Sequence, residues 1–215
     1  MRVLVACECS QKVCKAFRRR SIEAFSCDIQ DCYGGCPQWH IKGDVLEVLN
    51  DGWDLVIAHP PCTYLSKVQG NLIFERLSNG ASVVRDYDRL YSGIRAAIFF
   101  RSFLECSARF VCVENPLMLR CYGIRPPDCV IQPFEFGEPF SKATGLWLRN
   151  LPPLMPTDII DPSLVRSWHR VVPGFSKATK FKQVRLRSET FQGVANAIAS
   201  QYGDFVLSRL NGAYN

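Results

Sequence analysis

The sequence predicts an α/β domain with a mostly parallel sheet and helices on both faces. Short apolar runs that fit buried strands alternate with segments whose apolar residues recur at helical spacing. The chain has 215 residues, 47% of them hydrophobic. This is enough for one core, so we expect a single domain over residues 1–215.

Composition narrows the class of protein further. Residues 1–6 lead directly into a strand without the pattern of a signal peptide, and no apolar run is long enough to span a bilayer. Eleven cysteines could indicate a disulfide scaffold, but such scaffolds are shorter and lack a core. We therefore expect reduced thiols in a cytoplasmic protein. The net charge of +6 is moderate, so its distribution matters more than its size.

The first fifty residues are typical of a nucleotide-binding βαβ unit. A strand is expected over Val3–Cys7, followed by a helix that Ser10 caps and that ends in the basic run 18–20. A second strand, Ala24–Cys27, ends at Asp28. An acid at this position often accepts ribose hydroxyls, although a lone acid at a strand end can also be an ordinary loop residue.

A loop rich in turn residues follows at 31–40, and Asp44 begins the next element. Zinc could bind here, because the possible ligands Cys27, Cys32, Cys36 and His40 lie close together in the sequence. Their spacing matches no common zinc knuckle or ribbon, so we predict no metal.

Residues 55–62 are the stretch around which the rest is organised. The apolar run Leu55–Ala58 has the length of a buried strand, and Pro60-Pro61 cannot continue the strand ladder. Cys62 would therefore lie on a stiff loop at the carboxyl end of a strand, where open α/β sheets bind ligands. It is the candidate nucleophile, with an inert loop cysteine as the alternative.

A second chemical group follows the next predicted strand. Residues 67–92 are polar, with a turn at Asn79-Gly80, and are expected to form a mobile segment beside the site. A helix over Tyr91–Cys106 then leads to a strand at Phe110–Val113, which ends in Glu114. Two successive strands would thus bring Cys62 and Glu114 to one edge of the sheet.

Pro60-Pro61-Cys62 followed by Glu114-Asn115-Pro116 resembles motifs four and six of the DNA cytosine-5 methyltransferases. Residues 136–142 resemble motif eight, and the whole chain is similar to a short, phage-type branch of that family. The resemblance implies a Rossmann-like, S-adenosylmethionine-dependent methyltransferase fold in an intracellular protein encoded by a phage or bacterium. The partner would be DNA that contains cytosine, and a monomer and a dimer both remain open.

The resemblance also implies roles for residues. Cys62 would add to carbon 6 of cytosine and so activate carbon 5, while Glu114 would stabilise the adduct at N3. A base in duplex DNA would first be flipped out. The cofactor would contact Cys7, Glu8, Ser10, Asp28, Ile29, Asp44, Val45 and Pro60. The substrate would contact Pro61, Ser66, Asn115, Lys142, Thr144, Arg185 and Arg187.

Three departures from the family pattern keep alternatives open. The turn at 7–11 has no glycine, and Lys142 and Thr144 stand where motif eight has two arginines. A basic, loop-rich segment at 150–187 replaces a separate target-recognition domain. A pyrimidine nucleotide methyltransferase, or a related enzyme that modifies carbon 5, is the first alternative. A catalytically degenerate protein that binds nucleic acid or a host factor is the second.

The same segment carries basic residues with aromatic residues between them. No acidic residue occurs from Pro162 to Ser188, where Trp168 lies among arginines and lysines. Such a strip can bind phosphates and stack on bases, or it can be a solvated loop around a core tryptophan. A final helix over Phe191–Leu207 is expected to pack beside the first strand.

One rival chemistry is disfavoured by the residues themselves. Amino-methyltransferases hold an exocyclic amine with an Asn or Asp, two prolines and an aromatic residue. Here the corresponding positions are His59, Pro60, Pro61 and Cys62, so both the polar and the aromatic position differ.

Overall fold

A mixed, mostly parallel sheet forms the centre of the computed structural model, which describes residues 1–168 and 188–212. Its seven strands lie in the order β3-β2-β1-β4-β7-β10-β8. Strand β10 runs antiparallel to both of its neighbours, β7 and β8, and the other strand pairs of this sheet are parallel. The strands are β1 (Arg2–Ala6), β2 (Glu23–Asp28), β3 (His40–Lys42), β4 (Leu55–Ala58), β7 (Phe110–Pro116), β8 (Cys129–Ile131) and β10 (Thr144–Arg149). The predicted Rossmann-like α/β class is confirmed.

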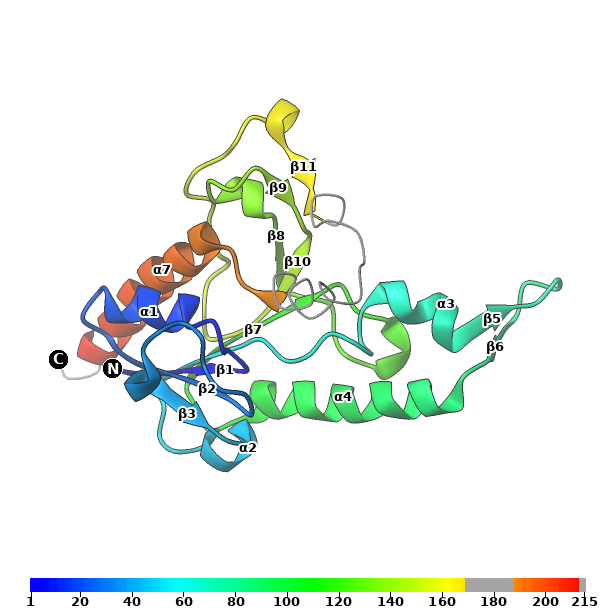
Figure 1. The fold of residues 1–215 in the computed structure, drawn as a ribbon, viewed down its shortest axis with the longest axis horizontal. Coiled ribbons are helices and arrows are strands. Elements are labelled where there is room, and N and C mark those ends of the chain that lie inside the picture. The colour runs from blue at the N-terminus through cyan, green and yellow to red at the C-terminus, as the bar shows by residue number, and fades with distance from the viewer. Residues whose placement is uncertain (169–187, 213–215) are drawn as a thin grey trace.

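Helices cover both faces of this sheet (Figure 1). On one face lie α1 (Lys12–Arg18) and α7 (Gln192–Asn211), and on the other lie α2 (Val45–Val48) and α4 (Tyr87–Glu105). Residues of α1 and α7 share one core cluster with Val3 and Val5 of β1. The final helix therefore packs against the first strand, as predicted.

Alternation along each central strand produces the two cores. Val3 and Val5 contribute to the cluster under α1 and α7, whereas Leu4 and Ala6 contribute to the cluster under α4. Successive strand side chains point to opposite faces, so a strand covered on both faces must be apolar throughout. This explains why Leu55–Ala58 is fully buried.

The helix boundaries differ from the predicted ones by a few residues. Helix α1 begins at Lys12 with Gln11 as its N-cap residue, so the expectation that Ser10 caps it was wrong. Helix α4 begins at Tyr87, four residues earlier than predicted, because the Asp86 carboxylate accepts the Arg89 N–H and caps the helix there. Helix α7 extends to Asn211.

Residues 67–92, predicted to be a mobile segment, contain short helices, a hairpin and the start of α4. A 3-10 turn (Lys67–Gln69) leads into α3 (Gly70–Ile73) and a hairpin of β5 (Phe74–Arg76) and β6 (Ser82–Val84). Gly80 has φ 84° at the hairpin turn, which confirms the predicted turn position. The hairpin projects beyond the end of α4 (Figure 1).

Between β10 and α7, the described residues contain little regular structure. This part holds a 3-10 turn (Pro162–Leu164) and β11 (Arg166–Ser167), which pairs with β9 (Phe140–Ser141) from before β10. Other short 3-10 turns lie earlier in the chain, at Pro37–Trp39, Arg120–Tyr122 and Pro133–Glu135. Within the described ranges, no helix is both long and apolar enough to cross a membrane.

Candidate active site

The candidate site lies at the carboxyl ends of β1, β4 and β7. After β1 the chain builds outward through β2 and β3, and then crosses back to place β4 and β7 on the other side of β1. Open α/β sheets bind ligands where the strand order reverses in this way. Glu8 and His59 follow β1 and β4 at this edge, and Glu114 lies within β7, which continues to Pro116 rather than ending at Glu114 as predicted.

The Pro60-Pro61 loop is fixed from both sides. The His59 N–H donates to the Ala6 carbonyl (3.0 Å), and the Asn115 amide donates to the Pro60 carbonyl (2.7 Å). The Cys62 carbonyl then accepts N–H groups from Leu65 and Ser66 in a turn. The exposed Cys62 thiol is therefore presented to solvent on a rigid loop, as a nucleophile requires.

The electrostatic surroundings of Cys62 act in opposite directions. Desolvation by the surrounding protein raises the pKa of the thiol, the charge of Lys142 lowers it, and the charge of Glu114 raises it, with a raised pKa as the net result. The thiol is thus mainly protonated at neutral pH. The Lys142 ammonium favours the thiolate, which is the reactive form.

Glu114 is held by an ion pair. Its Oε2 lies 2.7 Å from Nδ1 of His59, and the two side chains are only 14% and 9% exposed. Burial alone would raise the pKa of Glu114, but the bond to His59, the charges of His59 and Lys142 and a hydrogen bond from Thr190 lower it overall. For His59 the effects are opposite: burial lowers the pKa of the imidazole, and its carboxylate neighbours raise it above its ordinary value overall.

A small cavity lies next to Glu114. Lys142 and Thr144, both predicted to contact substrate, line it together with Glu114. The remaining lining residues are Ile131, Pro133, Glu189, Thr190, Phe191 and Val194. Three of the predicted site residues are thus brought together around one small cavity.

An aromatic cluster lies next to Lys142. The Trp168 ring packs edge-on against Phe140 (4.8 Å between centroids) and Phe191 (4.9 Å). The Lys142 Nζ lies 5.8 Å from the Phe191 ring centre. Trp168 therefore packs within this aromatic cluster, while residues 169–187 of the basic strip lie outside the described residues. Arg185 and Arg187, two predicted substrate contacts, lie outside the described residues.

The residues predicted to hold the cofactor separate into two groups. Asp28 and Asp44 lie close enough to Cys7 for their charges to raise the pKa of its thiol, in addition to the larger effect of burial. The side chain of Ile29, beside Asp28, is 72% exposed. An acid next to an exposed apolar side chain suits a ribose and a purine ring, so this part fits the adenosine of S-adenosylmethionine. Val45 and Pro60 are buried beneath this edge.

Glu8 and Ser10 do not fit the predicted role of cofactor ligands. The buried Glu8 carboxylate accepts the N–H groups of Val13 (2.7 Å) and Cys14 (3.1 Å) and the Ser10 hydroxyl (3.2 Å). An internal carboxylate thus occupies the start of α1, where a cofactor's anionic group could otherwise bind. The turn at 7–11, which has no glycine, is thus held by the Glu8 side chain.

The loop after β2 packs over the same turn. The Gln11 side chain exchanges two hydrogen bonds with the backbone of Cys36, and the Tyr33 N–H donates to the Cys9 carbonyl. A Cβ on Gly34 would lie 2.5 Å from the Ser10 carbonyl oxygen, so only glycine allows this approach. Among residues 1–168 and 188–212 no cluster of His, Cys, Asp or Glu side chains could hold a metal ion.

Two further predicted substrate contacts have structural roles. Asn115 is 1% exposed and its amide is committed to Pro60, so it positions the loop. Ser66 is 9% exposed and forms a β-bridge with Met118. Pro61 is exposed beside Cys62 and stays a candidate contact.

Sequence reasoning missed the partners of Glu114. His59 enters the predictions only as a mismatch to another chemistry, and Thr190 is not among the predicted site residues. The available signal was position, because His59 and Glu114 each directly follow a strand residue of the register pair Ala58 and Val113.

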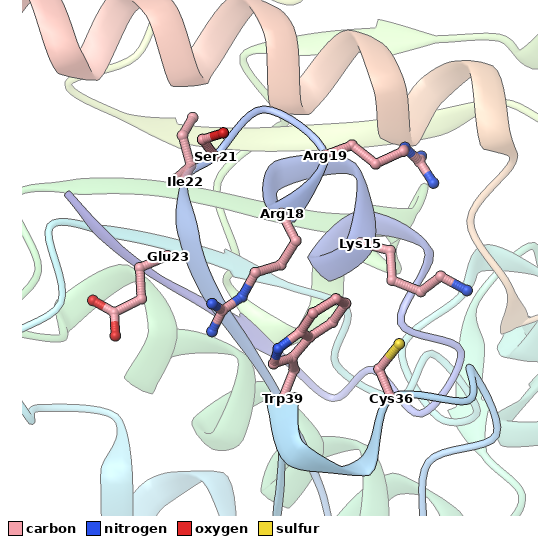
Figure 2. Close-up of a pocket in the computed structure, with 8 residues that line it drawn as sticks. All are labelled: Lys15, Arg18, Arg19, Ser21, Ile22, Glu23, Cys36 and Trp39. Carbon is pink, nitrogen blue, oxygen red and sulfur yellow. The ribbon is translucent and has the colours of Figure 1, made fainter.

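A larger cavity of about 750 Å³ lies elsewhere, beside the end of α1 and the start of β2. Figure 2 shows Arg18 extending between Trp39 and Glu23, and its guanidinium carbon lies 5.2 Å from the Trp39 ring centre. None of the predicted site residues lines this cavity, whose walls are Lys15, Arg18, Arg19, Ser21, Ile22, Glu23, Cys36 and Trp39.

No protein-family model and no curated protein sequence matches the chain. Solved structures similar to it include a DNA modification methyltransferase encoded within a prophage of E. coli (17% identity, TM-score 0.46, 74% of this chain and 52% of that one). The Entamoeba histolytica methyltransferase EhMeth is another (14% identity, TM-score 0.46, 74% and 57%), as is the S. pombe Dnmt2 methyltransferase (13% identity, TM-score 0.38, 71% and 50%). The chain spans about half the length of these structures.

Proposed function

We propose that this chain is a methyltransferase that modifies carbon 5 of cytosine in DNA, with Cys62 as nucleophile and Glu114 as the acid. The observation that carries the proposal is the placement of an exposed thiol in the loop after β4 and of a half-buried, paired carboxylate in the neighbouring parallel strand β7. A purely binding protein has no need of this combination.

The chemistry requires both groups. The Cys62 thiolate forms a bond to carbon 6 of the ring, and the electron pair of the 5,6 double bond moves toward N3, which takes a proton through Glu114. Carbon 5 then becomes nucleophilic. S-adenosylmethionine would supply the methyl group. Loss of the proton at carbon 5 and expulsion of the thiolate restore the aromatic ring.

The site residues divide this work. Lys142 favours the thiolate through its charge, and Asn115 fixes the loop that carries Cys62. Asp28, Ile29 and Asp44 would hold the adenosine of the cofactor. The N3 and O2 edge of a flipped base would point toward Glu114, Lys142 and Thr144, which line a cavity too small to hold the base itself.

DNA is favoured over a free nucleotide by charge. The chain carries a net charge of +6, and the attractive term for a phosphate backbone grows with the number of phosphates contacted. A pyrimidine nucleotide methyltransferase remains the second candidate, because the described part of 150–168 holds only a 3-10 turn and a two-residue strand.

The test is product analysis with labelled S-adenosylmethionine and three substrates: duplex DNA, single-stranded DNA and deoxycytidine monophosphate. We expect 5-methyldeoxycytidine after digestion of the DNA. Cys62→Ser should reduce its formation by a factor of about 10³ or more, whereas Cys121→Ser, at another exposed cysteine, should not. Product from the nucleotide alone would support the second candidate, and no product from any substrate would overturn both.

A further inference from the structure

We infer that His59 is a positioning residue that, as an imidazolium, fixes the Glu114 carboxylate and replaces the proton that Glu114 delivers to N3 of the substrate ring. The inference rests on the proposed function and deepens it. It assigns a role to a buried histidine next to the candidate nucleophile.

The backbone places the two side chains side by side. Ala58 and Val113 are register partners in adjacent parallel strands, so His59, which directly follows β4, lies next to Glu114 within β7. The backbone N–H of His59 also donates a hydrogen bond to the Ala6 carbonyl of β1, which fixes the histidine backbone. The 2.7 Å contact between Nδ1 and Oε2 is thus built into the fold rather than made by flexible surface side chains.

Charged groups from three elements act on this imidazole. Glu114 contacts it from β7, the buried Glu8 acts from the turn after β1, and Lys142 acts from the segment between β9 and β10. Burial lowers the pKa of His59, and Lys142 lowers it further, but the two carboxylates raise it above its ordinary value. Among the described residues, Nε2 has no partner, so Nδ1 carries the only hydrogen bond of the ring.

The proton balance follows from this pair. Glu114 is ionised at rest, since its pKa is lowered, so it needs a proton before it can donate one. The Nδ1 proton of His59 first moves to Oε2 of Glu114, and Glu114 then donates a proton to N3. The result is a neutral imidazole, an unchanged carboxylate and a neutral adduct. After methyl transfer, N3 returns its proton through Glu114 to His59, the carbon-5 proton passes to water, and the Cys62 thiolate is expelled.

The first experiment measures the protonation of His59 in the free protein by ¹H–¹⁵N NMR of the histidine rings. The chain has three histidines, and single His→Gln variants assign them. We expect His59 to be charged at pH 7 and its pKa to fall in Glu114→Gln and, less strongly, in Glu8→Gln. The resonances of His40, which bonds Ser26 and Gln30, should not respond. A neutral His59 at pH 7 would overturn the inference.

The second experiment is the pH profile of kcat/KM for DNA methylation. Above the pKa of the pair the proton is lost, so activity should decline on an alkaline limb. In His59→Gln, Glu114 must carry the proton alone, so the limb should move to lower pH and the maximum should fall about 10²-fold. Glu8→Gln, which keeps His59, should move the limb in the same direction by less.

A packing role would lower activity at every pH without moving the limb, and that result would overturn the inference. Absence of methylation by the wild-type protein would instead overturn the proposed function. The NMR titration needs no substrate, so the two failures are distinguishable.

Discussion

The reactivity of Cys62 depends on a balance between desolvation and the charge of Lys142. Lys142→Met removes the charge that lowers the pKa of the thiol, so the pKa should rise further and alkylation at pH 8 should slow several-fold. Peptide-resolved alkylation measures this, with the exposed Cys121 as an internal reference. Lys67→Met, at an exposed lysine that does not act on Cys62, should leave the alkylation rate of Cys62 unchanged. Equal rates in wild type and Lys142→Met would contradict this assignment.

Asn115 tests whether the Pro60 loop is held from β7. Asn115→Ala leaves the Pro60 carbonyl without its partner, which should lower the free energy of unfolding by about 1–3 kcal/mol. Urea unfolding measures this loss. Asn196→Ala, on the exposed face of α7, should cost less than about 0.5 kcal/mol. If the two variants were equally stable, the amide bond would have no role in holding the loop.

At the level of single residues, the sequence predicted that Cys62 and Glu114 lie at one edge of the sheet, but it did not predict the residues that hold them there. Pro60-Pro61 and the two strand ends were sufficient to bring Cys62 and Glu114 to one edge. The roles of Glu8 and Asn115 depend on which backbone groups lie next to them after folding. Spacing alone carries no such information, so both were predicted to contact ligands.

Among the elements, α7 packs closely against the turn at Phe136. An added Cβ on Gly193 would lie 1.7 Å from the Phe136 carbonyl oxygen, so Gly193→Ala must displace the helix or the turn. We expect a loss of about 1–3 kcal/mol in the free energy of unfolding. Gly212→Ala, whose Cβ would meet nothing within 4 Å, is the control. A neutral Gly193→Ala would show that α7 can shift freely.

Element types were more predictable than their ends. Apolar periodicity identified β1, β4, β7, α4 and α7, because these elements bury regular faces. The start of α4 depends on the Asp86 cap, which the polar composition of 67–92 concealed. The same polar composition concealed the hairpin β5–β6, whose Val83 is 41% exposed and supplies no buried pattern.

For the molecule as a whole, the His59–Glu114 pair should make stability depend on pH. The pKa of His59 is raised in the folded state, so its stabilising effect is complete below about pH 6.5 and declines as pH rises through the folded pKa. His59→Gln should therefore cost about 3 kcal/mol or more at pH 6, and less at pH 9. Urea unfolding at both values measures the difference, and a cost independent of pH would contradict a charged His59.

The order of strands explains why one edge carries the chemistry. The reversal at β1 and β4 gathers side chains that are far apart in the sequence, such as Glu8, His59 and Glu114. Composition and alternation predicted a mostly parallel sheet. They did not predict the antiparallel placement of β10 between β7 and β8, which brings Thr144 opposite Pro116. That placement decides which residues line the cavity.

The most direct test of the central claim is covalent trapping with DNA that contains 5-fluorocytosine. Fluorine replaces the carbon-5 proton whose loss releases the thiolate, and it cannot be removed in the same way, so the adduct persists. With S-adenosylmethionine present, we expect a denaturation-resistant adduct in wild type that is absent in Cys62→Ala and absent without the cofactor. Peptide mapping should locate the adduct at Cys62. No adduct on single-stranded or duplex DNA, or an adduct that persists in Cys62→Ala, would contradict the proposed mechanism.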